Sequence, residues 1–498
     1  MLLVKIKYYQ SDVERFKIAD IIPCLSIACY CKNEKEVTKL NELMIVEPLS
    51  FGETFTAELF YSTISDQPWS MWLDSCDSDH ENCQYDIIVW DPVATIETVA
   101  EDTNVNWIKS NKTENLKGDP LEIAKQTQLK IFDDISLPKS NLPFLGGSLG
   151  YFSYDLGRRF EVLPQIAIKE INAPDMSIGI YLQAIIFDKK TSSAFLVCLQ
   201  KNKTELLDNI QAKLIAHKAK TNTFNLDSDW YPNTTKNEYL TKFEKIQEYL
   251  LSGDCYQINL AQRFSANYNG DEFTAYQKLR QSNNAPFSAF LRFNDHSILS
   301  VSPERFLKLE KDKVQSKPIK GTMPRHTESS IDEENAKTLR NSTKDRAENL
   351  MIVDLLRNDV SKVCQPGSVK VPSLFAIESF PAVHHLVSTV EGTISPEFSA
   401  TDLLRGAFPG GSITGAPKIR AMEIIEELEP HRRHVYCGSI GYISACGNMD
   451  TSITIRTLIC EDNKIHCWAG GGIVADSTAE SEYQETFDKV AKILPVLK

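Results

Sequence analysis

The strand-rich pattern in the first half of this 498-residue chain constrains its fold more than any other feature. Residues 85–92 form an apolar run closed by a turn signal, and residues 180–187 and 194–199 are further apolar runs typical of buried strands. Residues 146–152 place glycines where backbones bend or approach each other closely. From about residue 66 to residue 220, the chain is therefore predicted to be built mainly from strands.

A polar stretch, residues 218–235, separates this part from a second half that opens with a helix. Thr235 and Glu238 have the spacing of a capping box, apolar side chains follow on one helical face, and Gly253 suits the position just after a helix. Residues 255–264 alternate between apolar and polar side chains, which predicts a strand with one apolar face.

The composition excludes several classes of protein. Apolar residues make up 42% of the chain and charged residues 24%, as in a soluble globular protein, and no apolar stretch is long enough to span a membrane. The net charge of −13, without a basic stretch, argues against a nucleic-acid partner but allows small anionic substrates. The twelve cysteines are scattered, and the first residues lack the order of a signal peptide, so we expect a cytoplasmic protein.

Residues 1–43 are interpreted as an atypical N-terminal extension, because they hold three of the cysteines and do not continue into any motif. Met44 opens a more ordinary stretch. Two hypotheses stay open: the extension is dispensable, or it is upstream sequence included by a start chosen too early.

Lys320 lies between an apolar run and a glycine turn, in the sequence Pro-Ile-Lys-Gly-Thr of residues 318–322. A lysine in this setting can lie against a substrate and, when deprotonated, attack it as an amine. The flanking cations Lys317 and Arg325 favour the neutral amine. A strand lysine whose ammonium group reaches solvent explains the same residue taken alone.

Two polar clusters adjoin predicted helices. Residues 346–359 are predicted to form a helix on which Glu348 borders an apolar face, where a carboxylate can also be an ordinary boundary residue. Ser412 and Thr414 lie in a glycine-rich loop, residues 408–418, that precedes another helix. Such a loop leaves backbone N–H groups free to bind an anion, and a plain loop before a well-capped helix is the alternative.

Arg456 lies among β-branched residues in one of two paired strands, which we predict at residues 441–443 and 451–458. If the side chain points to solvent, it needs no explanation. If it points inward, it needs an anionic partner, and a carboxylate bound through two hydrogen bonds is the natural one.

The last predicted helix carries Glu482 and Glu485 on one face, three residues apart. Ser477 and Glu480 have the spacing of a capping box at its start, which gives Glu480 a structural role. Carboxylates on two separate helices, here with Glu348 on the other one, suit a hard cation such as Mg²⁺ when no His or Cys is near.

Together these clusters resemble the chorismate-utilising enzymes, the family of anthranilate synthase, isochorismate synthase and aminodeoxychorismate synthase. The resemblance covers roughly residues 66–498, and its motifs occur in the family's order at residues 253–260, 318–322, 354–359 and 411–418. It implies an α+β fold: one large catalytic unit of two β-sheets packed with helices, the four-layer sandwich of anthranilate synthase component I. Periodicity alone does not predict this fold.

Within that unit, the resemblance implies two regions. Residues 44–220 correspond to an N-terminal region with a possible tryptophan pocket, and residues 235–498 to the catalytic region that binds chorismate.

The resemblance also implies how the substrate and a metal ion are bound. Mg²⁺ is expected to hold the ring carboxylate of chorismate through Glu348 and Glu485, with Glu482 as a direct or water-mediated ligand. Arg456 and Tyr436 match positions that hold the pyruvyl carboxylate, assisted by backbone N–H groups around Gly472, and the loop with Ser412 and Thr414 would close on the substrate.

Three further roles follow from the resemblance. Glu304 matches the general acid that protonates the departing C4 hydroxyl, for which its pKa must be raised. Lys320 would attack C2 as that hydroxyl leaves, and ammonia would then add at C4 and expel the lysine. His385 matches a histidine near the ring, where a catalytic and a structural role are equally open.

Lys320 favours the aminodeoxychorismate synthase branch of the family, because anthranilate synthases usually carry alanine at this position. An anthranilate synthase component I, or an inactive homologue that binds only tryptophan or a partner, stays the alternative. The sequence contains no Gly-x-Cys-x-Gly nucleophile motif of a glutamine amidotransferase, so ammonia is expected from a separate glutaminase subunit in a heterodimer.

Residues 73–75 resemble a motif where relatives bind tryptophan, either as an inhibitor or as a buried structural ligand. Ser75 would lie on one wall of that pocket, and Pro286 and Phe287 on the opposite wall. The following residues, 76–84, are more polar than such a pocket predicts.

Overall fold

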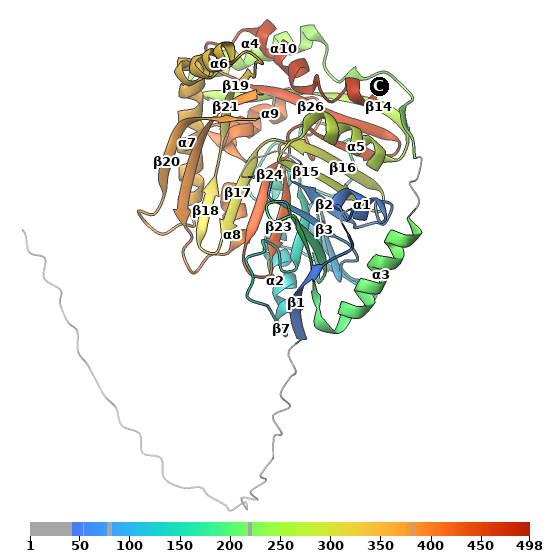
Figure 1. The fold of residues 1–498 in the computed structure, drawn as a ribbon. Helices are drawn as coiled ribbons and strands as arrows, with labels where there is room; N and C mark the ends of the chain where they lie inside the picture. The colour runs from blue at the N-terminus through green and yellow to red at the C-terminus, as the bar shows by residue number, and fades with distance from the viewer. Residues whose placement is uncertain (1–41, 53, 77–81, 218–221, 381–382) are drawn as a thin grey trace, which may run out of the picture. The chain divides into compact units, whose positions relative to one another are not determined.

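The strand β3 (Tyr85–Val89) shows why the chain folds in layers. Ile87 and Val89 pack in the central core, whereas Ile88 between them packs in a second core on the opposite face. Because successive side chains of a strand point to opposite faces, a strand that is apolar on both faces must be covered on both. The computed structural model describes residues 42–52, 54–76, 82–217, 222–380 and 383–498, which contain two large sheets (Figure 1).

The first sheet contains 14 strands within the described residues. Its order is β12 (Phe224–Leu226), β14 (Gln257–Gly270), β26 (Lys464–Ile473), β25 (Thr457–Glu461), β16 (His296–Ser302), β15 (Phe287–Arg292), β2 (Met71–Asp74), β3, β10 (Ala184–Asp188), β11 (Ser193–Leu199), β1 (Glu42–Leu49) and β7 (Ile135–Ser136), with β13 (Tyr231–Pro232) and β22 (Gly415–Ala416) paired to β14.

The second sheet contains 12 strands in the same part of the chain. Its order is β19 (Ile319–Pro324), β21 (Val383–Thr393), β18 (Lys313–Ser316), β17 (Arg305–Glu310), β24 (Met449–Ile453), β23 (Ser439–Ser444), β8 (Gly147–Phe152), β9 (Met176–Tyr181), β4 (Ala94–Val99), β5 (Asp102–Trp107) and β6 (Lys112–Leu116), with β20 (Lys370–Ser379) paired to β21.

Both sheets combine strands from the two halves of the sequence. In the second sheet, β23 pairs with β8, so that Gly441 lies opposite Gly150. In the first sheet, β15 pairs with β2, so that Ala289 lies opposite Leu73. The two regions expected from the sequence are therefore interleaved, and the described residues from Glu42 onward belong to one compact unit.

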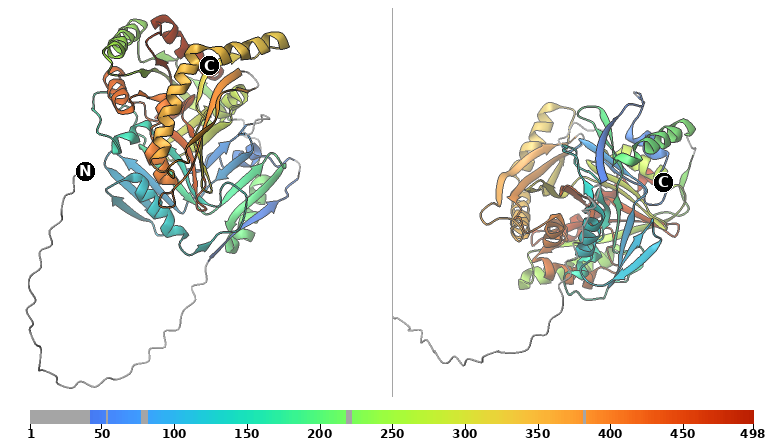
Figure 2. Two further views of the ribbon diagram at one scale, coloured as in Figure 1. Left: turned by 90° about the vertical axis from the view of Figure 1, so that its left-hand side faces the viewer. Right: turned by 90° about the horizontal axis from the view of Figure 1, so that it is seen from below.

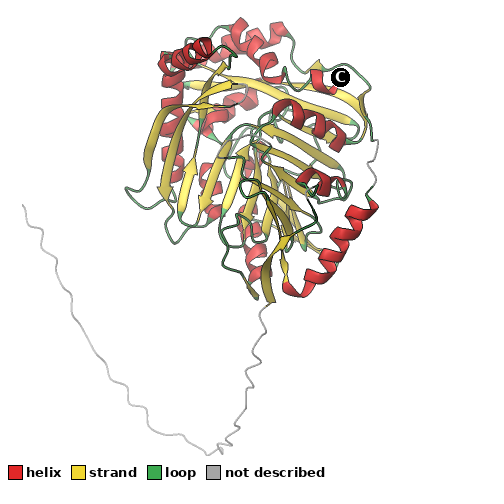
Figure 3. Cartoon of the chain, viewed as in Figure 1, coloured by secondary structure: helices red, strands yellow, loops and turns green. Residues whose placement is uncertain are grey.

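Helices cover the outer faces of the sheets, as Figure 3 shows by colour. They are α1 (Ala57–Ser62), α2 (Pro120–Phe132), α3 (Lys203–Ala216), α4 (Lys236–Ser252), α5 (Glu272–Asn283), α6 (Ser329–Asn341), α7 (Thr343–Ser361), α8 (Ala400–Ala407), α9 (Lys418–Leu428) and α10 (Ala479–Val490), with short 3₁₀ helices η1 (Tyr154–Arg159), η2 (Gln200–Asn202), η3 (Gly411–Ile413) and η4 (Pro495–Leu497). The helices α6 and α7 pack against β19 and β21 (Figure 2), and α4 and α10 pack together at β14 and β26 (Figure 1).

The expected α+β fold of two sheets packed with helices is confirmed, and so is the start of α4. Thr235 caps this helix in a capping box with Glu238, and Gly253 ends it in the left-handed conformation at φ 80°. The capping box expected from Ser477 is wrong. Thr478 is the N-cap residue of α10, and the Ser477 hydroxyl instead donates a hydrogen bond to Glu482, 2.6 Å away.

Two boundaries also differ from the sequence-based prediction. Residues 180–187 were expected to form one strand, but β9 ends at Tyr181 and β10 begins at Ala184, because the chain turns between them. The expected extension, residues 1–43, lies outside the described residues except for its last two, which belong to β1. Within the described residues, no helix combines the length and the apolar character needed to cross a membrane.

Candidate active site

Lys320, Ser412 and Glu304 come together from three separate segments of the chain. Lys320 lies in β19, and its Nζ donates a hydrogen bond to the backbone oxygen of Ser412, 3.4 Å away. The Ser412 hydroxyl in η3 donates to Oε1 of Glu304 at 3.3 Å. Three residues that the sequence assigns to catalysis and substrate binding therefore share one site.

Glu304 is 6% exposed, immediately before β17. Burial raises the pKa of this carboxyl to about 7, although Lys320 and the hydrogen bonds from Ile319 and Ser412 act in the opposite direction. A carboxyl group that is partly protonated near neutral pH can give a proton to a leaving group. Burial therefore gives Glu304 the raised pKa that a general acid needs, and its catalytic role stays a prediction.

Arg433 anchors the glycine loop that carries Ser412 through hydrogen bonds to the backbone. The Arg433 guanidinium donates to both carboxylate oxygens of Glu429, at 2.6 and 2.9 Å, and to the backbone oxygens of Ile413 and Asn259, at 2.9 and 2.7 Å. The expected substrate ligand Thr414 donates its hydroxyl hydrogen to the loop itself, with the backbone oxygen of Gly410 at 3.0 Å. In this arrangement the Thr414 side chain stabilises the loop.

Glu482 and Glu485 project from α10 onto the same glycine of β26. A Cβ atom on Gly471 would lie 2.9 Å from Glu482 Oε2 and 3.2 Å from Glu485 Oε1, so only glycine leaves room for these oxygens. Oε2 of Glu482 is buried and has no hydrogen-bond partner among the described residues. Burial raises the pKa of Glu482, whereas for Glu485 the ion pair with Lys489 outweighs burial and lowers the pKa.

The third expected metal ligand, Glu348, projects from α7. Burial raises its pKa, while Lys320 and Lys344 act in the opposite direction. Among the described residues, no group of three or more His, Cys, Asp or Glu side chains is close enough to hold a metal ion. The three expected glutamates therefore do not form a ready-made cluster among the described residues, and their role as metal ligands stays a prediction. A cation that takes one or two protein carboxylates still fits, because Glu482 offers a buried, unpaired oxygen beside Gly471.

Arg456 lies between β24 and β25 with φ 52°, outside the strand in which the sequence placed it. Burial lowers the pKa of its guanidinium, and the described residues give this group no ion pair or hydrogen bond. A largely buried cation without a protein partner is suited to bind an anionic ligand. This observation supports the inward-facing alternative from the sequence analysis.

His385 lies in β21 opposite Thr322, and its Nδ1 is 2.9 Å from the Thr322 hydroxyl. Burial, and then the nearby Arg456, lower the pKa of His385 to about 4, so its imidazole is neutral at physiological pH. His385 can therefore contribute hydrogen bonds near Arg456 without adding positive charge.

Tyr436 and Gly472 are both placed by β26, which contains Gly472 and also Trp468, the stacking partner of Tyr436. The Tyr436 ring is buried and stacks on Trp468, with ring centroids 6.2 Å apart and planes at 4°. Gly472 in β26 pairs with Asn259, and a Cβ atom there would lie 2.8 Å from Nε2 of Gln257.

Sequence reasoning missed Gln257 as a site residue. Its side chain is fully buried, and neither its amide nitrogen nor its amide oxygen has a hydrogen-bond partner among the described residues. The signal was present in the alternating strand, residues 255–264, where Gln257 is on the polar face. Burial of an unpaired amide beside Gly472 marks it as a group available to a ligand.

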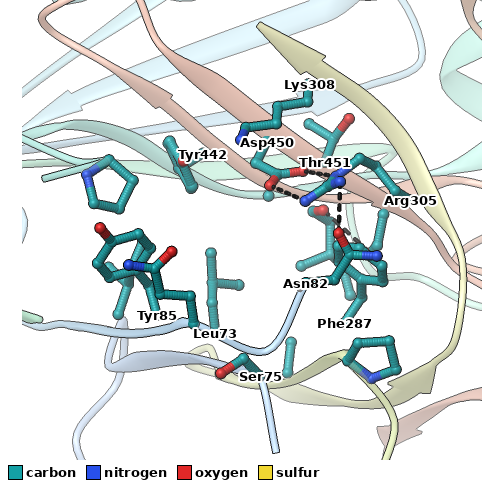
Figure 4. A pocket seen from close by; sticks show the side chains of 18 of the residues that line it. Leu73, Ser75, Asn82, Tyr85, Phe287, Arg305, Lys308, Tyr442, Asp450 and Thr451 are labelled. Carbon is teal, nitrogen blue, oxygen red and sulfur yellow. Dashed lines mark hydrogen bonds and ion pairs between the residues drawn. The ribbon is translucent and has the colours of Figure 1, made fainter. Parts of the chain in front are cut away.

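Ser75, Pro286 and Phe287 line a second cavity of about 210 Å³, as the sequence predicts (Figure 4). The Arg305 guanidinium lies over the Phe287 ring, 5.1 Å from its centroid, and donates two 3.0 Å hydrogen bonds to the Asp450 carboxylate. The Ser75 hydroxyl donates to Oδ1 of the buried Asp86 at 2.9 Å and is therefore part of the wall. Residues 77–81, part of the segment that is unusually polar, lie outside the described residues.

Comparisons with known proteins cover most of the chain. The sequence profile of the family described as chorismate binding enzyme matches residues 70–495. The chain is 53% identical over 443 residues to aminodeoxychorismate synthase component 1 of Salmonella typhimurium, and 53% identical over 444 residues to the Escherichia coli protein of the same name. Each of these alignments covers 89% of this chain and 96% of the relative.

Among solved structures, anthranilate synthase component I from Streptococcus pneumoniae superposes with a TM-score of 0.75 at 31% sequence identity. The superposition covers 90% of this chain and 99% of that one.

Glu304 makes the stability of the protein depend on pH in a predictable direction. The folded state raises the pKa of this group from 4.5 to about 7, so it binds the proton more tightly than the unfolded state does. The contribution of Glu304 to the free energy of unfolding is therefore lost as the pH rises from 4.5 to about 7. The variant Glu304→Gln has no ionisable group at this position and does not lose this contribution. The free energy of unfolding of the variant minus that of the unchanged protein should therefore rise by about 3 kcal/mol between pH 4.5 and pH 7.

Urea unfolding of both proteins at pH 5 and pH 8 measures this difference. Glu334→Gln, at an exposed glutamate of α6, is the control and should show no such trend. A stability difference that stays constant with pH would show that Glu304 is not protonated by burial.

Proposed function

This chain belongs to the chorismate-binding enzymes, and we propose that within the family it is component 1 of an aminodeoxychorismate synthase. It would convert chorismate and ammonia to 4-amino-4-deoxychorismate, a step of 4-aminobenzoate and folate biosynthesis. The identity to relatives of that name supports the assignment, but the observation that carries it is the placement of Lys320. This amine reaches the same serine as Glu304, a carboxyl group with a raised pKa.

The substrate would be held by groups that have no protein partner. Chorismate carries two carboxylates, and the largely buried guanidinium of Arg456 is the natural partner of the pyruvyl carboxylate. Tyr436 and the backbone around Gly472 would complete that binding site. The neutral imidazole of His385 can hydrogen-bond near the ring, and the amide of Gln257 is free to bind substrate or ammonia.

The reaction would proceed in two displacements. The nitrogen lone pair of Lys320 forms a bond to C2, the ring double bonds shift, and the C4–O bond breaks while Glu304 gives its proton to the departing oxygen, which leaves as water. Ammonia then forms a bond to C4, the double bonds shift back, and the C2–N bond to Lys320 breaks. Splitting the displacement in this way eases the loss of a poor leaving group.

Magnesium is proposed as the cofactor, with Glu485 and Glu348 as its ligands and Glu482 as a direct or water-mediated one. When bound, the ion would offset the negative charge of the substrate's ring carboxylate and of these glutamates. The unpaired Oε2 of Glu482 and the space left by Gly471 support this assignment.

Ammonia would come from a partner glutaminase subunit, because the sequence holds no glutaminase nucleophile motif and its relatives are named as a first component. We propose a heterodimer in the cytoplasm. This arrangement predicts that free ammonium can supply the ammonia for the reaction when the chain is assayed without its partner subunit.

Product analysis is the test of the proposed function. The purified chain with chorismate, Mg²⁺ and ammonium is expected to form aminodeoxychorismate, which liquid chromatography with mass spectrometry identifies. The rate should rise with pH, since neutral ammonia is the nucleophile, and glutamine in place of ammonium should give no product. Anthranilate and pyruvate as products would instead identify an anthranilate synthase, and no turnover would favour an inactive homologue.

Lys320→Ala is expected to slow aminodeoxychorismate formation by roughly a hundredfold or more, because the covalent route is lost. Lys313→Ala, at an exposed lysine of β18, is the control and should keep normal activity. In the unchanged enzyme with chorismate and no ammonia, denaturing mass spectrometry should find the substrate skeleton on Lys320. Full activity of the alanine variant together with the absence of any adduct would disprove the nucleophile role.

The second cavity is proposed to bind tryptophan. Ser75 and Pro286 line this cavity, and Phe287 supplies an aromatic wall against which an indole ring could pack. Denaturing the purified protein should release about one tryptophan per chain, or added tryptophan should bind in calorimetry. Phe287→Ala should weaken binding about tenfold or more, since aromatic contacts and buried area are both lost. Phe398→Ala, at an exposed phenylalanine, is the control, and equal binding by both variants would place the ligand elsewhere.

A further inference from the structure

Lys344 lies between two glutamates that come from different helices. Its Nζ is 3.9 Å from Oε1 of Glu348, one turn further along α7, and 3.9 Å from Oε1 of Glu482 on α10. The ammonium group therefore faces one carboxylate of each helix, the place where the cofactor assignment requires positive charge. Its side chain is 53% exposed, so it reaches this position from the solvent side.

The third glutamate has a different lysine. Lys489 forms an ion pair with Glu485 at 2.7 Å and also donates to the backbone oxygen of Gly470 at 2.6 Å. Lys344, by contrast, has no ion pair or hydrogen bond with described residues other than its two glutamates. A flexible lysine without a backbone anchor can leave its partners more easily than an anchored one.

A divalent cation and an ammonium group cannot share these carboxylates closely, because like charges a few ångströms apart repel strongly. Binding of Mg²⁺ by Glu348, with Glu482 as a direct or water-mediated ligand, therefore requires Lys344 to move away. Its exposure gives it a path to solvent, where the lost ion pairs are replaced by water.

We propose that Lys344 is the exchangeable counter-ion of this site: it balances Glu348 and Glu482 in the absence of metal and is displaced when a divalent cation binds. The proposal rests on the proposed function, because it takes these glutamates as metal ligands. It gives Lys344 a role in setting the metal affinity, distinct from the catalytic role of Lys320.

Titration calorimetry of the full chain with Mg²⁺ alone tests the proposal. Lys344→Met removes the competing charge and should lower the Kd for Mg²⁺ about three- to tenfold, the range expected for two partly exposed ion pairs. Lys344→Arg keeps the charge and should bind like the unchanged protein. Lys337→Met is the matched control: its ammonium group lies 4.0 Å from Glu334 on α6 and is 70% exposed, but that glutamate is not a proposed ligand.

A second measurement does not depend on a substitution. Labelling of the unchanged protein with an amine-reactive reagent, followed by peptide mass spectrometry, should show that Mg²⁺ increases modification of Lys344 and leaves Lys337 unchanged. This reports displacement of the side chain directly, and it stays informative if the methionine variant folds poorly.

The outcomes separate the two proposals. If the unchanged protein and all variants bind no Mg²⁺, the metal assignment itself fails, and the counter-ion role fails with it. If the unchanged protein binds Mg²⁺ but Lys344→Met binds it equally or more weakly, or if labelling of Lys344 does not rise, only the counter-ion role is overturned.

Discussion

The buried ion pair between Arg433 and Glu429 is the interaction on which the geometry of the active site depends. Arg433 is 1% exposed, and the glutamate carboxylate and two backbone oxygens accept its hydrogen bonds. Breaking a buried pair by removing one partner typically costs about 3–5 kcal/mol, because an unpaired charge stays inside. The glycine loop is therefore fixed against β14, and this position brings Ser412 to Lys320 and Glu304.

Some of the cations near the active site form ion pairs with glutamates of the described residues, and Arg456 does not. Lys344 and Lys489 face glutamates, so their charge balances the carboxylates proposed to bind a metal. Arg456 has no such partner among the described residues, and its burial makes an unpaired charge costly. The dianionic substrate proposed above would offset this cost, although the chain as a whole carries a net charge of −13.

The sequence predicted local elements and the fold better than the contacts within the site. Periodicity identified α4 and β14 because their apolar faces and caps are local features, and the family motifs led to the two-sheet fold. The sequence could not show that the Ser477 hydroxyl donates a hydrogen bond to Glu482 and does not cap α10. That choice depends on how α10 packs against β26, which is a tertiary contact. Sequence reasoning also missed Gln257, whose importance comes from burial beside Gly472, a pairing of strands distant in sequence.

The raised pKa of Glu304 results from its buried position, and two contacts with β24 fix that position. The backbone N–H of Ile453 donates to the backbone oxygen of Glu304 at 3.0 Å, and Asp450 of the same strand binds the side chain of the next residue, Arg305. Arg305 lines the second cavity, while Glu304 meets Ser412 of the active site. One strand junction therefore contributes both to this cavity and to the active site. Because desolvation is the largest cause of the Glu304 pKa shift, the raised pKa depends on this junction keeping the carboxyl group buried.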